Sequence, residues 1–383
     1  MTVRESDVII VGLGAMGSQA AAELAGRGQR VLAFDRLRPP HTEGSSHGRS
    51  RIIRQAYFEH PLYVPLVLRA YERWADLERQ TGRRLLTETG GLMLGLPDST
   101  LVAGARLSAE AHGLAHEMLG AADLRRRFPA FRVDRETVGL YELRAGILDP
   151  EGSVEVALDL ALARGAELRF NEVVEGWDAV AGGIEVHSAS GRHRAQRLVL
   201  AAGPWMSGLL GRHLPLEVER QVAYWFTPVR RAELFAPQRL PIWIWEWEQG
   251  HQAYGFPDVG DGVKVACHHE GARIAIERID RRVAEEEVAT MRRLLTRLLP
   301  DAPGALRASS VCCYTDAPDG HFVVGPLPGA PEVVVVSPCS GHGFKFAPVI
   351  AEIVADLVTG AAGRFDLGPF AVDRLLPPAG LRR

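Results

Sequence analysis

Lysine is almost absent from this 383-residue sequence, whose 44 Lys and Arg residues include only two lysines, Lys264 and Lys345. The composition has therefore moved nearly every surface cation to arginine. A lysine that persists under such a bias is expected where a compact, titratable ammonium is needed and a planar guanidinium would not serve. Both lysines are candidate functional residues, and the alternative is that their retention is accidental.

The sequence also lacks the features of several other protein classes. No run approaches the ~18 consecutive apolar residues of a membrane-spanning helix, and a net charge of −3 gives no general reason to expect a nucleic acid or a membrane as partner. The first predicted strand begins within a few residues of the start, so we expect no signal peptide and a cytoplasmic location. The four cysteines form neither a disulfide framework nor a zinc pattern, and we expect no metal.

A nucleotide-binding pattern is present between Asp7 and Asp35. An apolar strand over 8–11 is followed by glycines in G-x-G-x-x-G spacing, an alanine-rich helix over 15–26, and a second strand over 30–34 that the acid closes. In this pattern the first glycine allows a tight turn, the second lets backbone approach a pyrophosphate, and the third lets the helix pack closely on the strand. The helix N-terminus attracts the pyrophosphate, and the acid accepts a ribose hydroxyl. We therefore predict a dinucleotide site at Gly12, Gly14, Ala15, Met16, Gly17 and Asp35.

The rest of the chain predicts an α/β protein with two domains, because 383 residues exceed one ordinary core. Helices are expected over 60–82 and 153–164 and from a cap at Asp280 to Leu299, and strands over 183–188, 193–197, 198–202 and 333–336. The pattern changes to strands with one strong helix between about 218 and 311. We predict a Rossmann-like nucleotide-binding domain from residues 1–87, 150–216 and 318–383. Residues 88–149 and 217–317 are predicted to form an inserted α+β substrate domain on an antiparallel-rich sheet.

Three tryptophans alternate in the segment IWIWEWE, which places Trp243, Trp245 and Trp247 on one face of a predicted strand. One interpretation is a sheet face packed on a helix, which we favour for at least one of the three. The other is an aromatic wall that contacts a substrate, which we predict for Trp245.

Five motifs resemble those of the monomeric sarcosine oxidase and N-methyltryptophan oxidase family, flavoproteins of the D-amino-acid-oxidase-like superfamily. They are VGLGAMG at 11–17, PPHTEGSSHGRSRIIR at 39–54, YGFP at 254–257, VCCYT at 311–315 and SGHGFKF at 340–346. The resemblance implies a monomeric amine oxidase with FAD bound covalently through Cys312, because Tyr314 and Thr315 fix the register of the family's C-x-Y-T motif. The remaining cysteines, Cys267, Cys313 and Cys339, are expected to pack in the core.

The same resemblance assigns roles to individual residues. It implies that Arg54 and Lys345 hold the substrate carboxylate, that Lys264 activates oxygen by stabilising superoxide, and that Arg51 tunes the flavin. The residues implied on the substrate side are His268, Tyr254 and Tyr314. Further cofactor contacts are implied for Arg36, Ser45, His47, Arg51, Val174, Ala202, Gly203, Trp205, Cys312, Gly341, Gly343, Phe344 and Lys345.

The implied substrate is a secondary α-amino acid, sarcosine or another N-methyl amino acid. A hydride equivalent passes from the carbon beside nitrogen to FAD, water hydrolyses the imine to an amine and an aldehyde (formaldehyde for an N-methyl group), and dioxygen becomes hydrogen peroxide. The loop GSSHGRSR departs from the family's usual sequence at Ser46 and Arg49. Oxidases of cyclic imino acids, of the pipecolate or proline type, and tailoring amine oxidases therefore stay open as alternatives. A nicotinamide-dependent dehydrogenase and a non-catalytic flavin-binding module are the rivals from other classes.

Overall fold

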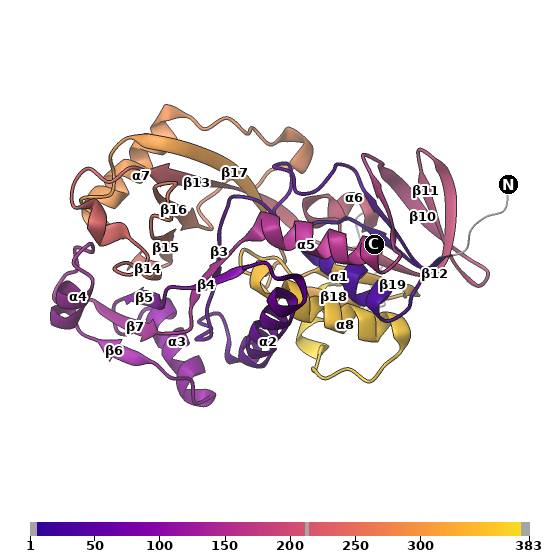
Figure 1. The fold of residues 1–383 in the computed structure, drawn as a ribbon, viewed down its shortest axis with the longest axis horizontal. Helices are drawn as coiled ribbons and strands as arrows, with labels where there is room; N and C mark the ends of the chain where they lie inside the picture. The colour runs from indigo at the N-terminus through magenta and orange to yellow at the C-terminus, as the bar shows by residue number, and fades with distance from the viewer. Residues whose placement is uncertain (1–5, 211–213, 377–383) are drawn as a thin grey trace.

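The computed structural model describes residues 6–210 and 214–376, and most of its strands belong to two large sheets (Figure 1). The first sheet contains β1 (Ser6–Val11), β2 (Val31–Asp35), β9 (Glu167–Phe170), β10 (Val174–Val180), β11 (Gly183–Ser188), β12 (Gly191–Leu200), β18 (Val323–Leu327) and β19 (Ala330–Ser337). Strands β19, β12, β1, β2 and β9 are parallel neighbours in that order. Strands β10, β11 and β18 extend the sheet with antiparallel pairs. The carboxyl ends of the parallel strands therefore share one edge, where ligands of open α/β sheets bind.

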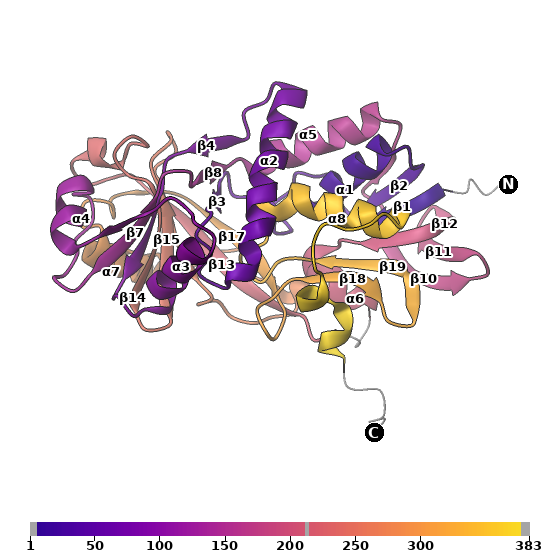
Figure 2. The ribbon, with the colours of Figure 1, turned by 90° about the horizontal axis from the view of Figure 1, so that it is seen from below.

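Helices cover both faces of the first sheet. Helices α1 (Ala15–Gly26), α5 (Pro150–Ala163) and α8 (Ala347–Thr359) lie over one face, and α2 (Val64–Thr81) packs beside α8 (Figure 2). The alanines of α1 are small enough for both neighbouring helices to pack closely against it. The short helix α6 (Met206–Leu210) lies on the opposite face. Because both faces are covered, the β1 residues Val8, Ile9 and Ile10 are fully buried, as their apolar run predicted.

The second sheet has the strand order β17-β13-β16-β15-β14-β5-β7-β6. Its strands are β5 (Gly91–Gly95), β6 (Glu117–Leu119), β7 (Val138–Glu142), β13 (Glu217–Phe226), β14 (Ile242–Glu248), β15 (His251–Phe256), β16 (Val263–His268) and β17 (Leu306–Asp316). All pairs are antiparallel except β14 with β5. Helices α3 (Thr100–Ala111), α4 (Ala121–Arg127) and α7 (Glu285–Leu298) pack around this sheet. The fold is therefore α/β, with an antiparallel-rich second sheet as predicted.

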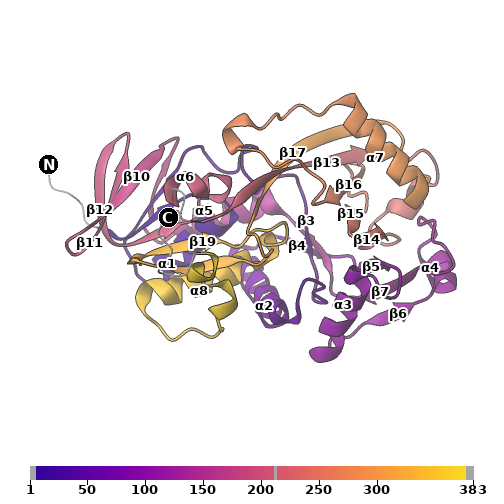
Figure 3. The same cartoon turned by 180° about the vertical axis from the view of Figure 1, so that it is seen from behind.

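Two features connect the large sheets. A small sheet of β3 (Arg51–Ile53), β8 (Gly146–Leu148) and β4 (Leu86–Glu88) lies between them. The long strands β13 and β17 reach from the second sheet toward the first, as Figure 3 shows from behind. The chain thus brings residues of both sheets to one shared region.

Several predicted boundaries are confirmed and others are corrected. The bounds of α1 and β11 agree with the sequence-based expectation, and Gly82 ends α2 with a φ of 68°. The helix expected from Ser153 begins at Pro150, because proline has no N–H to lose in a first turn and the Asp149 side chain accepts from Gly152 N. The strands expected over 193–197 and 198–202 are one continuous strand, β12.

The expected cap at Asp280 is also corrected. The Asp280 carboxylate instead accepts hydrogen bonds from the backbone N–H and the guanidinium of Arg282. Helix α7 begins five residues later, and the Glu287 carboxylate accepts from the N–H of its N-cap residue, Ala284. Glu287, in the first turn of α7, therefore bonds the N-terminal N–H of the helix that Asp280 was expected to cap.

No helix in the described parts of the chain combines the length and the apolar character that crossing a membrane requires.

Candidate active site

A cavity of about 500 Å³ lies where the carboxyl ends of β1, β2 and β12 meet the second sheet. Its volume is in the range of cofactor and small-molecule sites. Of the residues that the sequence assigned to a site, all line this cavity except Gly17 and Trp245. Segments far apart in the sequence therefore supply one site.

The glycines at the end of β1 have separate structural tasks. Gly12 has a φ of +95°, and a Cβ there would lie 2.4 Å from the carbonyl oxygen of Ala201. A Cβ at Gly17 would lie 1.7 Å from the Gly12 oxygen, so this glycine allows helix–strand packing and does not itself line the cavity. At Gly14 a Cβ would approach only the Ser46 hydroxyl, at 3.2 Å. The second glycine is therefore the one that opens backbone to a ligand.

Asp35 holds two turns of the predicted nucleotide site. Its Oδ2 accepts from Leu13 N at 2.7 Å, and its Oδ1 accepts from Leu37 N at 2.9 Å. The carboxylate is buried, lines the cavity, and keeps further lone pairs that a ribose hydroxyl can use. The other predicted residues at this part of the cavity are Arg36, Val174, Ala202, Gly203 and Trp205.

Buried hydroxyl groups without partners among the described residues show that a polar cofactor fits the cavity. Among the buried hydroxyls without a hydrogen-bond partner in the described chain, those of Ser45 and Ser337 belong to cavity-lining residues. The hydroxyl of Ser46 accepts from Ala15 N at 3.0 Å, at the first turn of α1. Ser46 was not predicted as a cofactor contact, although its place in the polar loop was a usable signal. An open backbone cradle with unsatisfied hydroxyls nearby fits a dinucleotide such as FAD.

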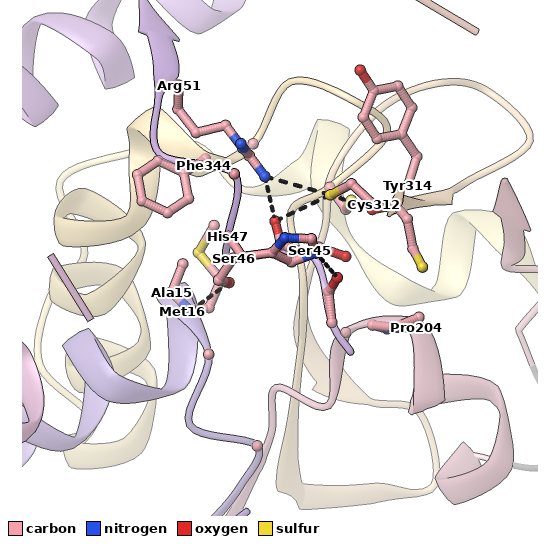
Figure 4. A pocket seen from close by; sticks show the side chains of 18 of the residues that line it. Ala15, Met16, Ser45, Ser46, His47, Arg51, Pro204, Cys312, Tyr314 and Phe344 are labelled. Atoms are coloured by element: carbon pink, nitrogen blue, oxygen red, sulfur yellow. Dashed lines mark hydrogen bonds between the residues drawn. The ribbon is translucent and has the colours of Figure 1, made fainter. Parts of the chain in front are cut away.

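Cys312 faces the cavity beside Arg51 (Figure 4). Alternation along β17 places Ser310, Cys312 and Tyr314 on the same face. Arg51 Nη2 lies 3.4 Å from Cys312 Sγ and donates to the Ser45 carbonyl at 2.8 Å. Burial raises the pKa of Cys312, but the Arg51 guanidinium and then His47 outweigh burial and lower that pKa to about 7. Cys312 is therefore poised as a thiolate nucleophile.

The other three cysteines have the opposite acidity. Burial raises the pKa of Cys267 and Cys313 to about 12 and that of Cys339 to about 11. Cys313 is fully buried, although it also borders the cavity. Cys339 was expected in the core but lines the cavity, and its Sγ accepts from Thr315 N at 3.2 Å.

Lys264 is held by three neutral oxygen atoms. Its Nζ donates to the carbonyls of Gly48 (2.7 Å) and Ser50 (2.9 Å) and to the Ser50 hydroxyl (2.9 Å). The ammonium also lies over the rings of Trp225 and Phe256. Burial lowers the pKa of Lys264 well below its usual value, and the positive Arg51 lowers it further. The protein thus fixes the position of this group while disfavouring its charge.

Arg54 and Lys345 lie together at another part of the cavity. The Arg54 Nη2 atom donates to both Glu59 carboxylate oxygens, at 2.6 and 2.5 Å. Lys345 Nζ donates to the His342 carbonyl at 2.6 Å and to the Tyr57 hydroxyl at 3.3 Å. Burial lowers the pKa of Lys345 to about 7. Burial raises the pKa of Glu59, but the Arg54 guanidinium outweighs burial, and the pKa is lowered to about 2. Sequence reasoning missed Glu59, although it follows Arg54 by five positions, and nothing local in the sequence pointed to Tyr57 or His342.

Neutral hydrogen-bonding groups complete the predicted substrate side. His268 Nδ1 lies 3.2 Å from the Tyr314 hydroxyl, and Tyr254 lines the same cavity. Burial, followed by the neighbouring His269, lowers the pKa of His268 well below its usual value. Burial raises the pKa of both tyrosines. These three side chains are therefore uncharged near pH 7.

The predicted substrate contact at Trp245 is corrected. Trp245 is 5% exposed, packs edge-on against Phe131 with ring centroids 5.8 Å apart, and belongs to the core beneath α7. Trp243 is fully buried in the same core, and Trp247 packs against its edge. On the opposite face of β14 it is Ile244 that lines the cavity. The tryptophans therefore form a sheet face packed on a helix, which was the alternative interpretation.

Comparisons with known proteins show which proteins this chain is similar to. Residues 7–357 match the family model described as FAD dependent oxidoreductase. A monomeric sarcosine oxidase from Streptomyces avermitilis is 46% identical over 375 residues, covering 96% of this chain and 97% of that protein. An N-methyl-L-tryptophan oxidase from Salmonella heidelberg is 35% identical over 370 residues, with 96% and 98% covered. The solved structure of NikD, described as an unusual amino acid oxidase essential for nikkomycin biosynthesis, superposes with a TM-score of 0.82 at 27% identity, over 99% of this chain and 98% of that one.

Proposed function

Because this chain belongs to the family of FAD-dependent oxidoreductases, alongside the monomeric sarcosine oxidases and N-methyl-L-tryptophan oxidases, we propose that it oxidises secondary α-amino acids. N-methyl amino acids such as sarcosine are the first candidates. The observation that carries the proposal is that one cavity is lined by Cys312, Arg54 and both lysines of the chain. Membership of an FAD-dependent family argues against the alternative function of a nicotinamide-dependent dehydrogenase.

Residues 1–87, 150–216 and 318–383 would hold the FAD, and the glycine turn after β1 with Asp35 would bind its pyrophosphate and ribose. Cys312 would form the covalent link, because it combines a lowered pKa with a position in the cavity. FAD, when bound, accepts a hydride equivalent from the carbon beside the substrate nitrogen and passes the electrons to dioxygen. Arg51 would hold the Cys312 sulfur and the Ser45 carbonyl in place through its guanidinium.

Residues 88–149 and 217–317 would supply most of the substrate side. The substrate carboxylate would bind between Arg54 and Lys345, because a planar fork and a point charge together fix both its position and its plane. The neutral His268 and Tyr314 would orient the amine without repelling it. Lys264 would face negative charge that develops when oxygen is reduced. We propose that the chain acts as a monomer in the cytoplasm and that its reaction needs no metal.

The first experiment follows the yellow colour of the purified holoenzyme through acid denaturation and sedimentation. Colour in the pellet is expected, because a thioether to Cys312 survives unfolding. The Cys312→Ser variant should release the colour to the supernatant, whereas the matched Cys313→Ser variant should retain it. Release of the colour from the unmodified protein would support bound FAD but contradict the covalent link. A protein that stays colourless after FAD is supplied would contradict the proposal.

The second experiment compares substrates by hydrogen peroxide formation. Sarcosine and other N-methyl amino acids should give the highest kcat/KM, with one formaldehyde per peroxide. Faster oxidation of pipecolate or proline, which release no formaldehyde, would favour the cyclic imino acid alternative. The absence of peroxide from every amine in the presence of bound FAD would favour the non-catalytic module.

A further inference from the structure

Three metal-ligating side chains meet at the edge of the second sheet, outside the cavity. They are Glu219 of β13, His269 directly after β16, and Asp316 at the end of β17. One candidate ligand atom of each lies within 4.8 Å of the others. Glu219 Oε2 is 3.1 Å from His269 Nδ1, and Asp316 Oδ2 is 3.7 Å from the same nitrogen. The chain thus concentrates two carboxylates and one imidazole at a single point.

Asp316 gives the cluster an unsatisfied ligand. The residue is 7% exposed, and neither of its carboxylate oxygens has a hydrogen-bond partner in the described chain. A second buried carboxylate, that of Glu219, lies in the same cluster. The His269 imidazole, 3.7 Å away, is a charged partner of Asp316 when it is protonated. Burying a carboxylate without a hydrogen bond is nevertheless costly, and a second carboxylate nearby adds like-charge repulsion. A cation between them would relieve both costs.

The other atoms of the cluster are arranged to orient ligands. Glu219 Oε1 accepts from Gly271 N at 2.8 Å and from the Gln221 amide, which leaves Oε2 directed at His269. A backbone hydrogen bond with Ser340 holds the His269 ring. Metal-binding histidines and carboxylates are usually held by such outer contacts. The separations of 3.1 and 3.7 Å bracket the roughly 3.4 Å expected between ligands about 2.0–2.1 Å from a tetrahedral zinc ion.

We propose that Glu219, His269 and Asp316 bind one divalent transition-metal cation of the zinc class. His269 Nδ1 and one oxygen of each carboxylate are the ligands, and water takes the fourth position on the exposed side of the imidazole. This inference does not rest on the proposed oxidase activity, which needs no metal. The lack of a zinc pattern among the cysteines led us to expect no metal, whereas these three ligands lie some 50 residues apart and share no short spacing motif.

The metal would also brace one wall of the cavity. Asp316 lies two positions after Tyr314 on β17, and His269 directly follows His268. The ring centroids of His269 and Tyr314 are 5.2 Å apart, and those of His268 and His269 are 4.2 Å apart. A cation that joins β13, β17 and the end of β16 therefore fixes the backbone behind two predicted substrate contacts. We assign it a structural task.

The test uses the chelator-treated holoenzyme with zinc chloride in isothermal titration calorimetry and cobalt(II) as a spectroscopic probe. The unmodified protein should bind one ion per chain and give the visible absorption bands of four-coordinate cobalt. Asp316→Asn and His269→Gln should each weaken binding at least ~10-fold, as loss of a ligand predicts. His251→Gln is the matched control, because it removes a second histidine–carboxylate pair, with Glu270 at 2.6 Å, and should leave binding unchanged.

Thermal unfolding separates metal binding from a folding defect. Asp316→Asn is isosteric and removes one of the two buried carboxylates together with its 3.7 Å ion pair to His269, so its Tm without metal should stay close to that of the unmodified protein. Zinc should raise the Tm of the unmodified protein and not that of the variant. Failure of the unmodified holoenzyme to bind one ion per chain would overturn the proposal. Equal binding by the Asp316→Asn and His269→Gln variants would overturn it as well.

Discussion

The surroundings of the two buried lysines differ in how they hold a positive charge. The three hydrogen-bond acceptors of Lys264 are neutral oxygens of Gly48 and Ser50. Lys345 instead lies beside an ion pair, in which Arg54 already holds the carboxylate of Glu59. The first surroundings fix the position of Lys264 without an anion, and burial followed by Arg51 lowers its pKa. The second surroundings place Arg54 and Lys345 around the carboxylate of Glu59. This leaves an excess positive charge that a second carboxylate can neutralise.

This difference indicates different partners for the two lysines. A fixed ammonium facing a cavity stabilises negative charge that appears only during a reaction, because no rearrangement is needed when the charge forms. A group of two cations and one carboxylate suits a stable anion, because the ion pair can exchange one carboxylate for another. Substitutions at each lysine separate these two roles.

The largest effect is expected for Lys264→Met. Reoxidation of the reduced enzyme by dioxygen should slow by ~10²–10³-fold, because a positioned charge at developing negative charge is worth about that much. Reduction of the enzyme by substrate should change by less than ~threefold. Stopped-flow absorbance measures both steps separately. Unchanged reoxidation would exclude Lys264 as the oxygen-activating group.

Lys345→Met should instead affect binding. A small carboxylate without an amine, such as propionate, should bind ~10–100-fold more weakly, because a hydrogen bond to a charged group is worth about 1.5–3 kcal/mol. Reoxidation should match that of the unmodified protein. Titration of the flavin spectrum measures the Kd, and Lys345→Arg is the control that keeps charge without the compact ammonium. Equal binding by Lys345→Met would remove this lysine from the carboxylate site.

The pH dependence of the same titration sharpens the assignment. The pKa of Lys345 is about 7 in the free protein, and a bound carboxylate raises it because it favours the ammonium. Affinity should therefore be constant below about pH 7 and fall by up to ~tenfold per pH unit above it, until the pKa of the complex is reached. In Lys345→Met this fall should disappear. A fall that persists in the variant would belong to another group.

The smallest effect is expected for Glu59→Gln. Removing the charge of this internal competitor should free Arg54 for the ligand and tighten propionate binding by ~3–10-fold. The pKa of Glu59 is about 2, so the competitor is ionised throughout the working pH range. The measurement is the same titration, at fixed ionic strength. Weaker binding in this variant would show that Glu59 positions Arg54 and does not compete for it.

What the sequence could predict depended on how local the signal was. The glycine turn, α1 and Asp35 lie within one contiguous stretch, and their geometry follows from backbone sterics and close helix–strand packing. Cys312 and the lysines were found through the motif resemblance, and the composition also singled out the lysines. The partners Glu59, Tyr57 and His342 come together only in the folded chain, and no spacing rule connects them.

The wrong predictions have the same cause. The alternation of tryptophans in β14 established that they share a face, but period alone does not say which face meets the ligand. Trp245 packs beneath α7 because that helix covers its side of the sheet. Asp280 is a good capping residue by type, yet the helix begins where a later acid, Glu287, can satisfy its terminus. Arg220 of β13 also donates to the Glu287 carboxylate at 2.6 Å, so both outcomes depend on tertiary contacts.

The spread of thiol acidity among the cysteines has a practical consequence. Cys312 has a pKa of about 7, whereas Cys267, Cys313 and Cys339 have pKa values of about 11 to 12. Near neutral pH a mild electrophile would therefore find one nucleophile in the flavin-free chain, although four thiols are free. The protein offers a single labelling handle inside its own cavity, to which synthetic redox dyes or reactive cofactor analogues could be attached without mutating any other cysteine.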